Sequence, residues 1–241
     1  MYPGKYAEQN PDRSAFVMAA TGERVSYQEF EARSNRVAHY LADKGLGFQD
    51  HYSIFMENNN RYLESCAAGE RSGLYFTCIN SFLTSDELAY IINNSESQIL
   101  ITSMSKLEAA QEALAQCTAI KEVLVVGAGD ADLPEGMSDF ESTLSKYPET
   151  PLERELLGAA MLYSSGTTGR PKGIVRPLPE QSPDEPLPVI GFLSGLWRYR
   201  EDMIYLSPAP LYHSAPQAAV GLTLRMGGTV VIMERFDPAD Y

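Results

Sequence analysis

One polar loop, residues 163–173, constrains this chain more than any other stretch. An apolar run over residues 159–163 precedes it and predicts a buried strand, and Ile174 and Val175 follow it. Between these runs, residues 164–173 hold four hydroxyl side chains, three glycines, an arginine and a lysine. The sequence therefore predicts a loop that extends between two pieces of core structure.

The composition of this loop is typical of a site for a polyphosphate. Glycine tolerates positive φ, so two of these glycines can turn backbone N–H groups inward to form an anion-binding nest. The hydroxyl groups add donors, Lys172 adds a positive charge, and Pro171 stiffens the backbone before the lysine. The predicted phosphate-binding residues are Ser164, Ser165, Gly166, Thr167, Thr168, Gly169 and Lys172.

Most loops rich in serine, threonine and glycine are only solvated connections. The order Pro171-Lys172-Gly173 after a strand favours phosphate binding here. The loop is not a Walker motif, in which a second glycine immediately precedes the lysine and Ser or Thr follows it.

Residues 163–173 resemble the phosphate-loop signature of the acyl-adenylate-forming superfamily, which includes acyl-CoA synthetases, luciferases and peptide-synthetase adenylation domains. Within it the chain most resembles fatty-acid and related acyl-CoA ligases, from about residue 10 to the last residue. The resemblance implies an ATP-dependent ligase that adenylates a carboxylic acid, releases pyrophosphate and transfers the acyl group to coenzyme A. It also implies Mg²⁺, which would bridge the β- and γ-phosphates of ATP.

A second candidate site follows a predicted strand at residues 203–206. His213 stands in the run Pro210-Leu211-Tyr212-His213, and a lone histidine is more often structural than functional. The resemblance implies that His213 lines the acyl pocket, so His213 and Lys172 are the predicted catalytic residues. Relatives usually carry glycine three residues after this histidine, where this chain has Pro216.

Alternating strand and helix patterns predict an α/β fold with mostly parallel sheets flanked by helices. Ser26 with Glu29, Thr84 with Glu87, and Ser105 with Glu108 are predicted capping boxes at helix starts. We expect an N-terminal α/β subdomain over residues 1–150. Residues 151–241 are expected to begin a second one, truncated, that carries the phosphate loop.

Composition limits the partners and the location of the protein. A net charge of −13 argues against nucleic acid, whose backbone binds basic surfaces. Cys66, Cys78 and Cys117 are too far apart in sequence for a zinc knuckle or a redox pair. No apolar run approaches the roughly 18 residues of a membrane span, and the first residues lack a signal-peptide core, which predicts a cytoplasmic protein.

The resemblance also calls for parts that would follow residue 241, among them a magnesium-binding glutamate, a ribose-binding aspartate and a C-terminal lid domain with a catalytic lysine. We therefore expect the N-terminal part of an acyl-CoA synthetase. One alternative is a short protein of the same fold that binds nucleotide or a partner protein without catalysis. Another is a phosphotransferase that uses Lys172 on a γ-phosphate and yields ADP rather than AMP.

Overall fold

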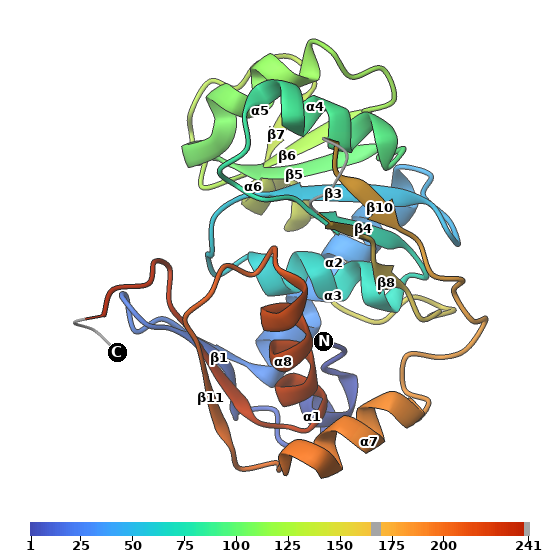
Figure 1. The fold of residues 1–241 in the computed structure, drawn as a ribbon, viewed down its shortest axis with the longest axis vertical. Helices are drawn as coiled ribbons and strands as arrows, with labels where there is room; N and C mark the ends of the chain where they lie inside the picture. Colours follow the sequence, from blue (N-terminus) through green and yellow to red (C-terminus); the bar gives the residue numbers. More distant parts are fainter. Residues whose placement is uncertain (165–169, 239–241) are drawn as a thin grey trace.

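A six-stranded, fully parallel sheet forms the larger half of the molecule. The computed structural model describes residues 1–164 and 170–238 (Figure 1). The sheet has the strand order β7-β6-β5-β3-β4-β8. Its strands are β3 (His51–Phe55), β4 (Tyr75–Cys78), β5 (Ile99–Ser103), β6 (Glu122–Val126), β7 (Met137–Asp139) and β8 (Ala159–Ala160).

Both faces of this sheet are buried, because alternate side chains enter two different clusters. Ile54 and Ile101 pack in one apolar cluster, whereas Phe55 and Leu100 pack in the other. Two helices, α4 (Ser85–Asn94) and α5 (Leu107–Leu114), cover one face, and the opposite face is covered by α2 (Tyr27–Asp43), α3 (Tyr62–Arg71) and α6 (Phe140–Leu144). The predicted mostly parallel α/β fold is confirmed.

A smaller, four-stranded sheet lies on the other side of α2 and α3 (Figure 1). Its strand order is β11-β12-β1-β2, and only the β1–β2 pair is antiparallel. Phe16 of β1 and Val230 of β12 pair in register and enter the same cluster as α2 and α3. One core therefore joins the two sheets. The strands are β1 (Ser14–Met18), β2 (Arg24–Ser26), β11 (Ile204–Ser207) and β12 (Thr229–Ile232), and the helices beside them are α1 (Gly4–Gln9) and α8 (Ser214–Arg225).

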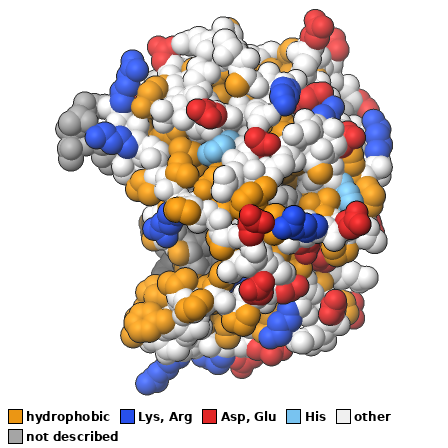
Figure 2. Space-filling model, turned by 90° about the vertical axis from the view of Figure 1, so that its right-hand side faces the viewer, with side chains coloured by type: hydrophobic (Ala, Val, Ile, Leu, Met, Phe, Trp, Pro, Cys, Tyr) orange, Lys and Arg blue, Asp and Glu red, His pale blue; other side chains and the backbone are white. Residues whose placement is uncertain are grey.

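Helix α7 (Pro188–Trp197) follows residues 177–183, which have no regular structure. The helix has a proline in its first turn. Its apolar side chains gather low on the face shown in Figure 2. Those exposed to solvent are Val189, Phe192, Leu196 and Trp197.

Two of the three predicted capping boxes are present, at Ser26 with Glu29 and at Thr84 with Glu87. The third prediction, at Ser105, is wrong. Helix α5 begins at Leu107 after a short 3₁₀ turn, and the hydroxyl of Ser105 instead donates to the carboxylate of Glu57 at 2.5 Å. Ser105 lies inside the 3₁₀ turn Met104–Lys106 and not at the residue before α5, so its oxygen is not placed to accept from the first turn of that helix.

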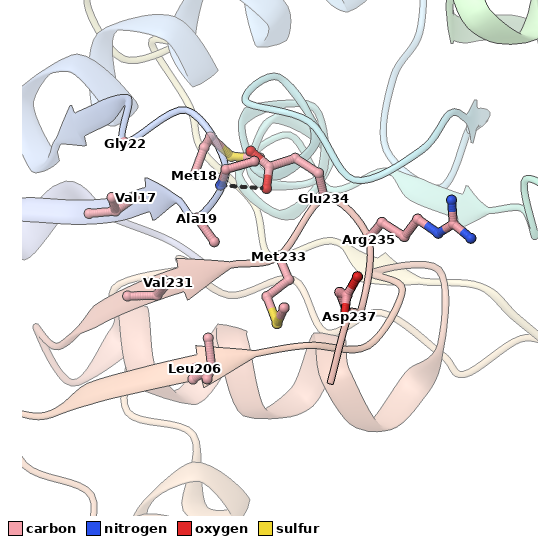
Figure 3. A pocket seen from close by; sticks show the side chains of 11 residues that line it. Val17, Met18, Ala19, Gly22, Leu206, Val231, Met233, Glu234, Arg235 and Asp237 are labelled. Carbon is pink, nitrogen blue, oxygen red and sulfur yellow. Dashed lines mark hydrogen bonds between the residues drawn. The ribbon is translucent and has the colours of Figure 1, made fainter. Parts of the chain in front are cut away.

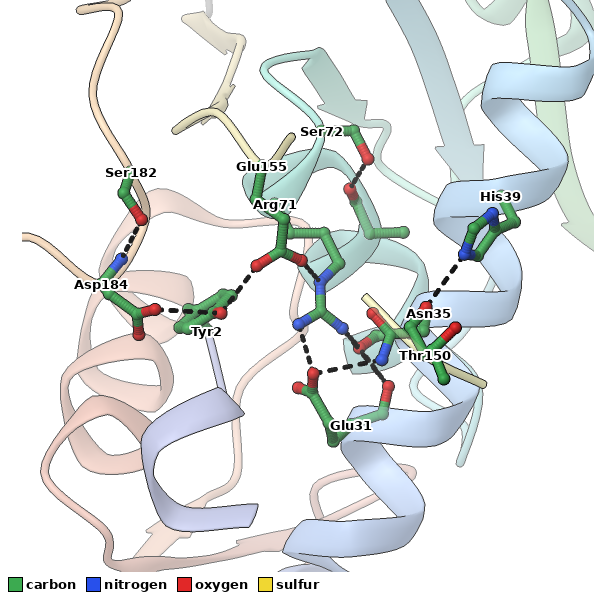
Figure 4. Close-up of polar contacts among 12 residues, drawn as sticks. Tyr2, Glu31, Asn35, His39, Arg71, Ser72, Thr150, Glu155, Ser182 and Asp184 are labelled. Atoms are coloured by element: carbon green, nitrogen blue, oxygen red, sulfur yellow. Dashed lines mark hydrogen bonds and ion pairs between the residues drawn. The ribbon is translucent and has the colours of Figure 1, made fainter. Parts of the chain in front are cut away.

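A buried arginine ties the N-terminal residues to the segment that follows residue 149 (Figure 4). The guanidinium of Arg71, fully buried, forms ion pairs of 2.6 Å with both Glu31 of α2 and Glu155. Tyr2 donates its hydroxyl proton to the other oxygen of Glu155, and its ring lies 5.1 Å from the guanidinium. These contacts fix three segments that are far apart in sequence.

Two sequence predictions concern the chain as a whole. The four-stranded and the six-stranded sheet each combine strands from before and after residue 150. The predicted division into two subdomains stays a prediction. Among the described residues, no helix has the length and apolar character needed to cross a membrane. The cytoplasmic location also stays a prediction.

Two of the three cysteines are neighbours in the fold. The sulfurs of Cys66 and Cys78, both buried, lie 3.6 Å apart without a disulfide. Their 12-residue separation hid this contact, because α3 folds back onto β4 and brings the two side chains together.

Candidate active site

The phosphate loop leaves and re-enters the fold through a β-hairpin. Strand β9 (Leu162–Ser164) pairs antiparallel with β10 (Lys172–Ile174), and the register places Ser164 opposite Lys172. A Cβ at Gly173 in β10 would lie 2.3 Å from the terminal methyl of Met161, so any larger residue there requires the methionine side chain to move. Thus the hairpin sets the two ends of the predicted loop beside each other.

Three tyrosines hold this hairpin and its flanks against the larger sheet and α4. Tyr90 donates to the carbonyl of Pro171 at 3.0 Å, Tyr163 donates to the side-chain oxygen of Asn94 at 2.8 Å, and Tyr75 donates to the carbonyl of Arg176 at 2.6 Å. A hairpin of three-residue strands is marginal by itself. These bonds to the main body therefore determine where the loop ends lie.

His213 lies at the other side of the site, as the residue immediately before α8. Its imidazole is exposed and its ring centroid lies 4.4 Å from that of Tyr212. Both side chains line a cavity of about 420 Å³ that Ser164 also lines. The remaining lining residues are Thr77, Cys78, Ile79, Asn80, Leu83, Ile91, Tyr163 and Pro171.

The structure thus brings together two of the predicted site residues, Ser164 and His213. Lys172 is exposed and lies at the hairpin position opposite Ser164, but it does not line the cavity. The predicted residues Ser165, Gly166, Thr167, Thr168 and Gly169 lie outside the described residues, and their phosphate contacts stay predictions.

Sequence reasoning missed the residues that β4 contributes. Thr77 is fully buried, and its hydroxyl has no hydrogen-bond partner among the described residues although it lines the cavity. Asn80 follows the carboxyl end of β4. Ligands of parallel α/β sheets bind outside the carboxyl ends of the strands. Applied to β4, this rule could have identified both residues from the sequence.

Cationic and phenolic side chains around the hairpin set the electrostatics of the site. Arg170 places its guanidinium 5.1 Å from the ring centroid of Tyr90, which leaves a second cation next to Lys172. Burial, with the nearby Tyr90, raises the pKa of Tyr163 to about 12, and burial raises the pKa of Tyr212. Both phenols therefore remain neutral donors near neutral pH, beside a positively charged loop end.

The described part of the chain holds no group of three or more His, Cys, Asp or Glu side chains that could bind a metal ion. The donor set around the cavity consists of hydroxyls, an amide and an imidazole. Such residues do not fit a protein-bound Mg²⁺, which prefers carboxylates.

A larger cavity, of about 930 Å³, lies at the carboxyl ends of β1 and β12 (Figure 3). Its wall includes Arg235, Asp237 and Glu234, and the Glu234 carboxylate accepts a hydrogen bond from the backbone N–H of Ala20 at 3.0 Å. Of the predicted site residues that the structure describes, Ser164, Lys172 and His213, none lies in its wall. We therefore place the candidate active site in the cavity beside the hairpin.

Among the described residues, the cavity at the carboxyl end of β4 thus brings the hydroxyl of Ser164 together with an exposed histidine. The profile of the AMP-binding enzyme family matches residues 5–241, and the chain belongs to this family.

Similar proteins are two to three times longer than the matched region. The chain is 28% identical, over 95% of its length, to a medium/long-chain-fatty-acid–CoA/3-oxocholest-4-en-26-oate–CoA ligase of Mycolicibacterium smegmatis, and it covers 44% of that protein. It is also 28% identical to 4-coumarate–CoA ligase 1 of Petroselinum crispum, with 94% of the chain and 41% of that protein covered. The crystal structure of ATP-bound MatB from Rhodopseudomonas palustris superimposes with a TM-score of 0.75 at 27% identity, covering 99% of this chain and 46% of MatB.

Proposed function

We propose that this chain carries the ATP- and acyl-binding half of an acid–CoA ligase. The observation that carries the proposal is the cavity shared by Ser164 and His213, with Lys172 opposite Ser164 in the hairpin. Hydroxyl donors and an imidazole line this cavity, and the lysine lies outside it at the hairpin position opposite Ser164. That arrangement suits a site in which a bound carboxylate reacts with a bound triphosphate.

In the first step a carboxylate oxygen of the acid attacks the α-phosphorus of ATP. The P–O bond to the pyrophosphate breaks, and pyrophosphate leaves with the negative charge. Lys172 and the hydroxyl of Ser164 are proposed to stabilise this charge, together with the loop residues between them. His213 is proposed to hold the acyl carboxylate in position for the attack.

In the second step the sulfur of coenzyme A attacks the acyl carbonyl, and AMP leaves with the electrons of the broken C–O bond. Mg²⁺ supplies charge neutralisation on the phosphates when it accompanies ATP. We propose that it arrives with ATP, because the described residues offer it no ligand set.

The substrate class follows from the cavity and the relatives together. The relatives act on fatty acids, a sterol-derived acid and 4-coumarate, all of which join a carboxylate to a largely apolar body. The cavity wall offers apolar residues such as Ile79 and Leu83 beside its polar groups. We propose a medium-sized, mainly apolar carboxylic acid.

The test is carboxylic-acid-dependent exchange of labelled pyrophosphate into ATP, measured on the protein as its source cell makes it. Lys172→Ala is expected to lower exchange at least about tenfold, since removal of one donor to a developing charge commonly has this effect. Lys146→Ala, which removes an exposed lysine from the segment after α6, is the matched control and should leave the exchange rate unchanged. Equal rates in both variants would contradict the proposal.

The two alternative functions predict different outcomes when the protein is supplied with ATP. A non-catalytic nucleotide-binding protein would bind ATP without exchange. A phosphotransferase would release ADP instead of AMP.

A further inference from the structure

The side-chain amide of Asn58 bridges two backbone segments. Its Nδ2 donates to the carbonyl of Met233 at 2.9 Å and to that of Ala209 at 3.3 Å, and its Oδ1 accepts from the N–H of Leu211 at 2.8 Å. The residue is only 7% exposed. Both ends of a buried amide are thus satisfied. Its removal would leave three backbone groups without this partner, which is unfavourable away from water.

This bridge connects the carboxyl ends of the two sheets. Asn58 lies three residues after β3, a strand in the interior of the six-stranded sheet. Met233 directly follows β12 of the four-stranded sheet, and Ala209 and Leu211 follow β11 of the same sheet. One side chain therefore links the edge at which β3 ends to the edge at which β11 and β12 end.

The segment that leads to His213 takes its hydrogen-bond support from Asn58. Pro208 and Pro210 have no backbone N–H to donate. Within the described part of the chain, no other side chain hydrogen-bonds to the backbone of residues 208–212. The N–H of His213 donates to the carbonyl of Pro210 at 3.2 Å, and Pro210 lies between the two residues that Asn58 holds. Asn58 thus fixes the turn from which His213 extends.

The two sides of the candidate active site are attached to different sheets. Tyr75 of β4 and Tyr90 of α4 hold the phosphate hairpin against the larger sheet and its helices. His213 immediately precedes α8, which packs on β11 and β12 of the smaller sheet. The position of His213 relative to the hairpin therefore depends on contacts between the two sheets, and the bridge of Asn58 is such a contact at the turn itself.

Resting on the proposed function, we propose that Asn58 is a positioning residue for the adenylation step. By holding residues 209–211 it keeps the imidazole of His213 where the bound carboxylate can attack the α-phosphorus. Asn58 does not line the active-site cavity, so its effect passes through His213. A shift of a reacting group by about 1 Å can lower a rate roughly 100-fold, so such a bridge affects the reaction without touching the substrate.

The first test is the pyrophosphate-exchange assay, with each rate divided by the number of ATP sites found by calorimetry, so that unfolded protein does not contribute. Asn58→Leu, close in size to the asparagine, is expected to lower the maximal exchange rate at least about tenfold and to leave the dissociation constant for ATP unchanged. In His213→Ala the same substitution should cost less than about twofold more, because the group that Asn58 positions is already gone. An equal loss in both backgrounds would overturn the inference.

Asn35 of α2 provides the matched control. It is a fully buried asparagine whose Nδ2 donates to the carbonyl of Glu149 at 2.7 Å and to the carboxylate of Glu31 at 3.1 Å. Asn35→Leu should destabilise the protein as well, but the exchange rate per ATP site should stay at the wild-type value. A loss equal to that of Asn58→Leu would mean that exchange responds to stability alone, and it would contradict the role of Asn58.

Imidazole NMR signals test the positioning without any reaction. The 241-residue chain contains three histidines, His39, His51 and His213, and His213→Ala assigns the third signal. Asn58→Leu is expected to shift the signal of His213 and to leave that of His39 in place. Asn58→Ala takes its place if the leucine variant does not fold.

The control variant should affect a different histidine. The Nε2 of His39 lies 2.9 Å from the carbonyl oxygen of Thr150, next to the residue that Asn35 holds, so Asn35→Leu should shift His39 and not His213. An unmoved His213 signal in the Asn58 variant would overturn the inference even in a protein without exchange activity. A signal that moves in a protein whose wild type shows no exchange would contradict only the proposed function.

Discussion

The hydroxyl of Tyr90 on α4 donates a hydrogen bond to the carbonyl oxygen of Pro171, and so fixes the residue that directly precedes Lys172. The same ring lies under the guanidinium of Arg170. Tyr90, on a helix that covers the larger sheet, thus contacts two consecutive residues, Arg170 and Pro171, at the end of the phosphate loop. The position of the lysine depends on this contact because the hairpin itself is short.

Tyr90→Phe is therefore expected to weaken ATP binding about three- to tenfold, since it removes one neutral hydrogen bond that positions Lys172. The measurement is calorimetric titration with ATP. Tyr147→Phe, which removes a hydroxyl that donates to Asp43 on α2, is the matched control and should bind ATP normally. If both variants bind equally well, Tyr90 has no role in positioning the loop.

Arg71 is expected to be essential for stability. Its replacement by alanine leaves the carboxylates of Glu31 and Glu155 buried without a cation, which typically lowers the free energy of unfolding by about 3–5 kcal/mol. Urea denaturation measures the change. Arg154→Ala, which breaks the exposed pair with Glu180, should change stability by less than about 1 kcal/mol.

Glu64 is expected to make the protein less stable as the pH rises. Burial raises the pKa of this carboxyl to about 7, and the attraction of Arg61 only partly opposes the shift. Between about pH 4.5 and pH 7 the folded chain keeps a proton that the unfolded chain has released, so stability falls with increasing pH. The total change is up to roughly 3 kcal/mol.

Replacing this carboxyl by an amide removes the titration. The stability difference between the wild type and Glu64→Gln should therefore shift in favour of the variant from pH 5 to pH 8, measured by urea unfolding at each pH. Glu112→Gln, at an exposed position of α5, should show a constant difference. A constant difference for Glu64→Gln as well would contradict the prediction.

Two glycine-to-alanine substitutions should have opposite signs. A Cβ at Gly158 would lie 2.1 Å from the carbonyl oxygen of Gly69 and 2.4 Å from that of Leu74, both backbone atoms that cannot move aside. Gly158→Ala should therefore destabilise the fold by more than about 2 kcal/mol. Gly191→Ala, in the open interior of α7, should stabilise it by about 0.5–1 kcal/mol, because alanine restricts the unfolded chain. Thermal unfolding of both variants checks the signs.

Much of the fold was predictable because its signals are local. The capping boxes at Ser26 and Thr84 lie within four residues of chain, and the strands of the larger sheet are short apolar runs that alternate with helices. Ser105 shows where local reasoning fails. Its pattern was that of a cap, but Glu57, which follows another strand, takes its hydroxyl.

The candidate site was predictable only in part, for the same reason. The hydroxyl, glycine and lysine pattern of the loop is contiguous, so it predicts Ser164 and Lys172 as phosphate-binding residues, which stays a prediction. Thr77 and Tyr90 reach the site through tertiary packing, and neither stands in a motif. Their roles depend on the strand order of the sheet, which the sequence does not specify residue by residue.

The parallel pairing of β1 with β12 has a consequence for how the protein is made. Thr229 donates its hydroxyl proton to the carbonyl of Ser14, across 215 residues of sequence. At typical rates of synthesis of about 5–20 residues per second, the first strand waits roughly 10–40 s on the ribosome before its partner is translated. The parallel sheet of residues 51–160 can form during that delay, while the edge of β1 that pairs with β12 remains open to chaperones and to other nascent chains.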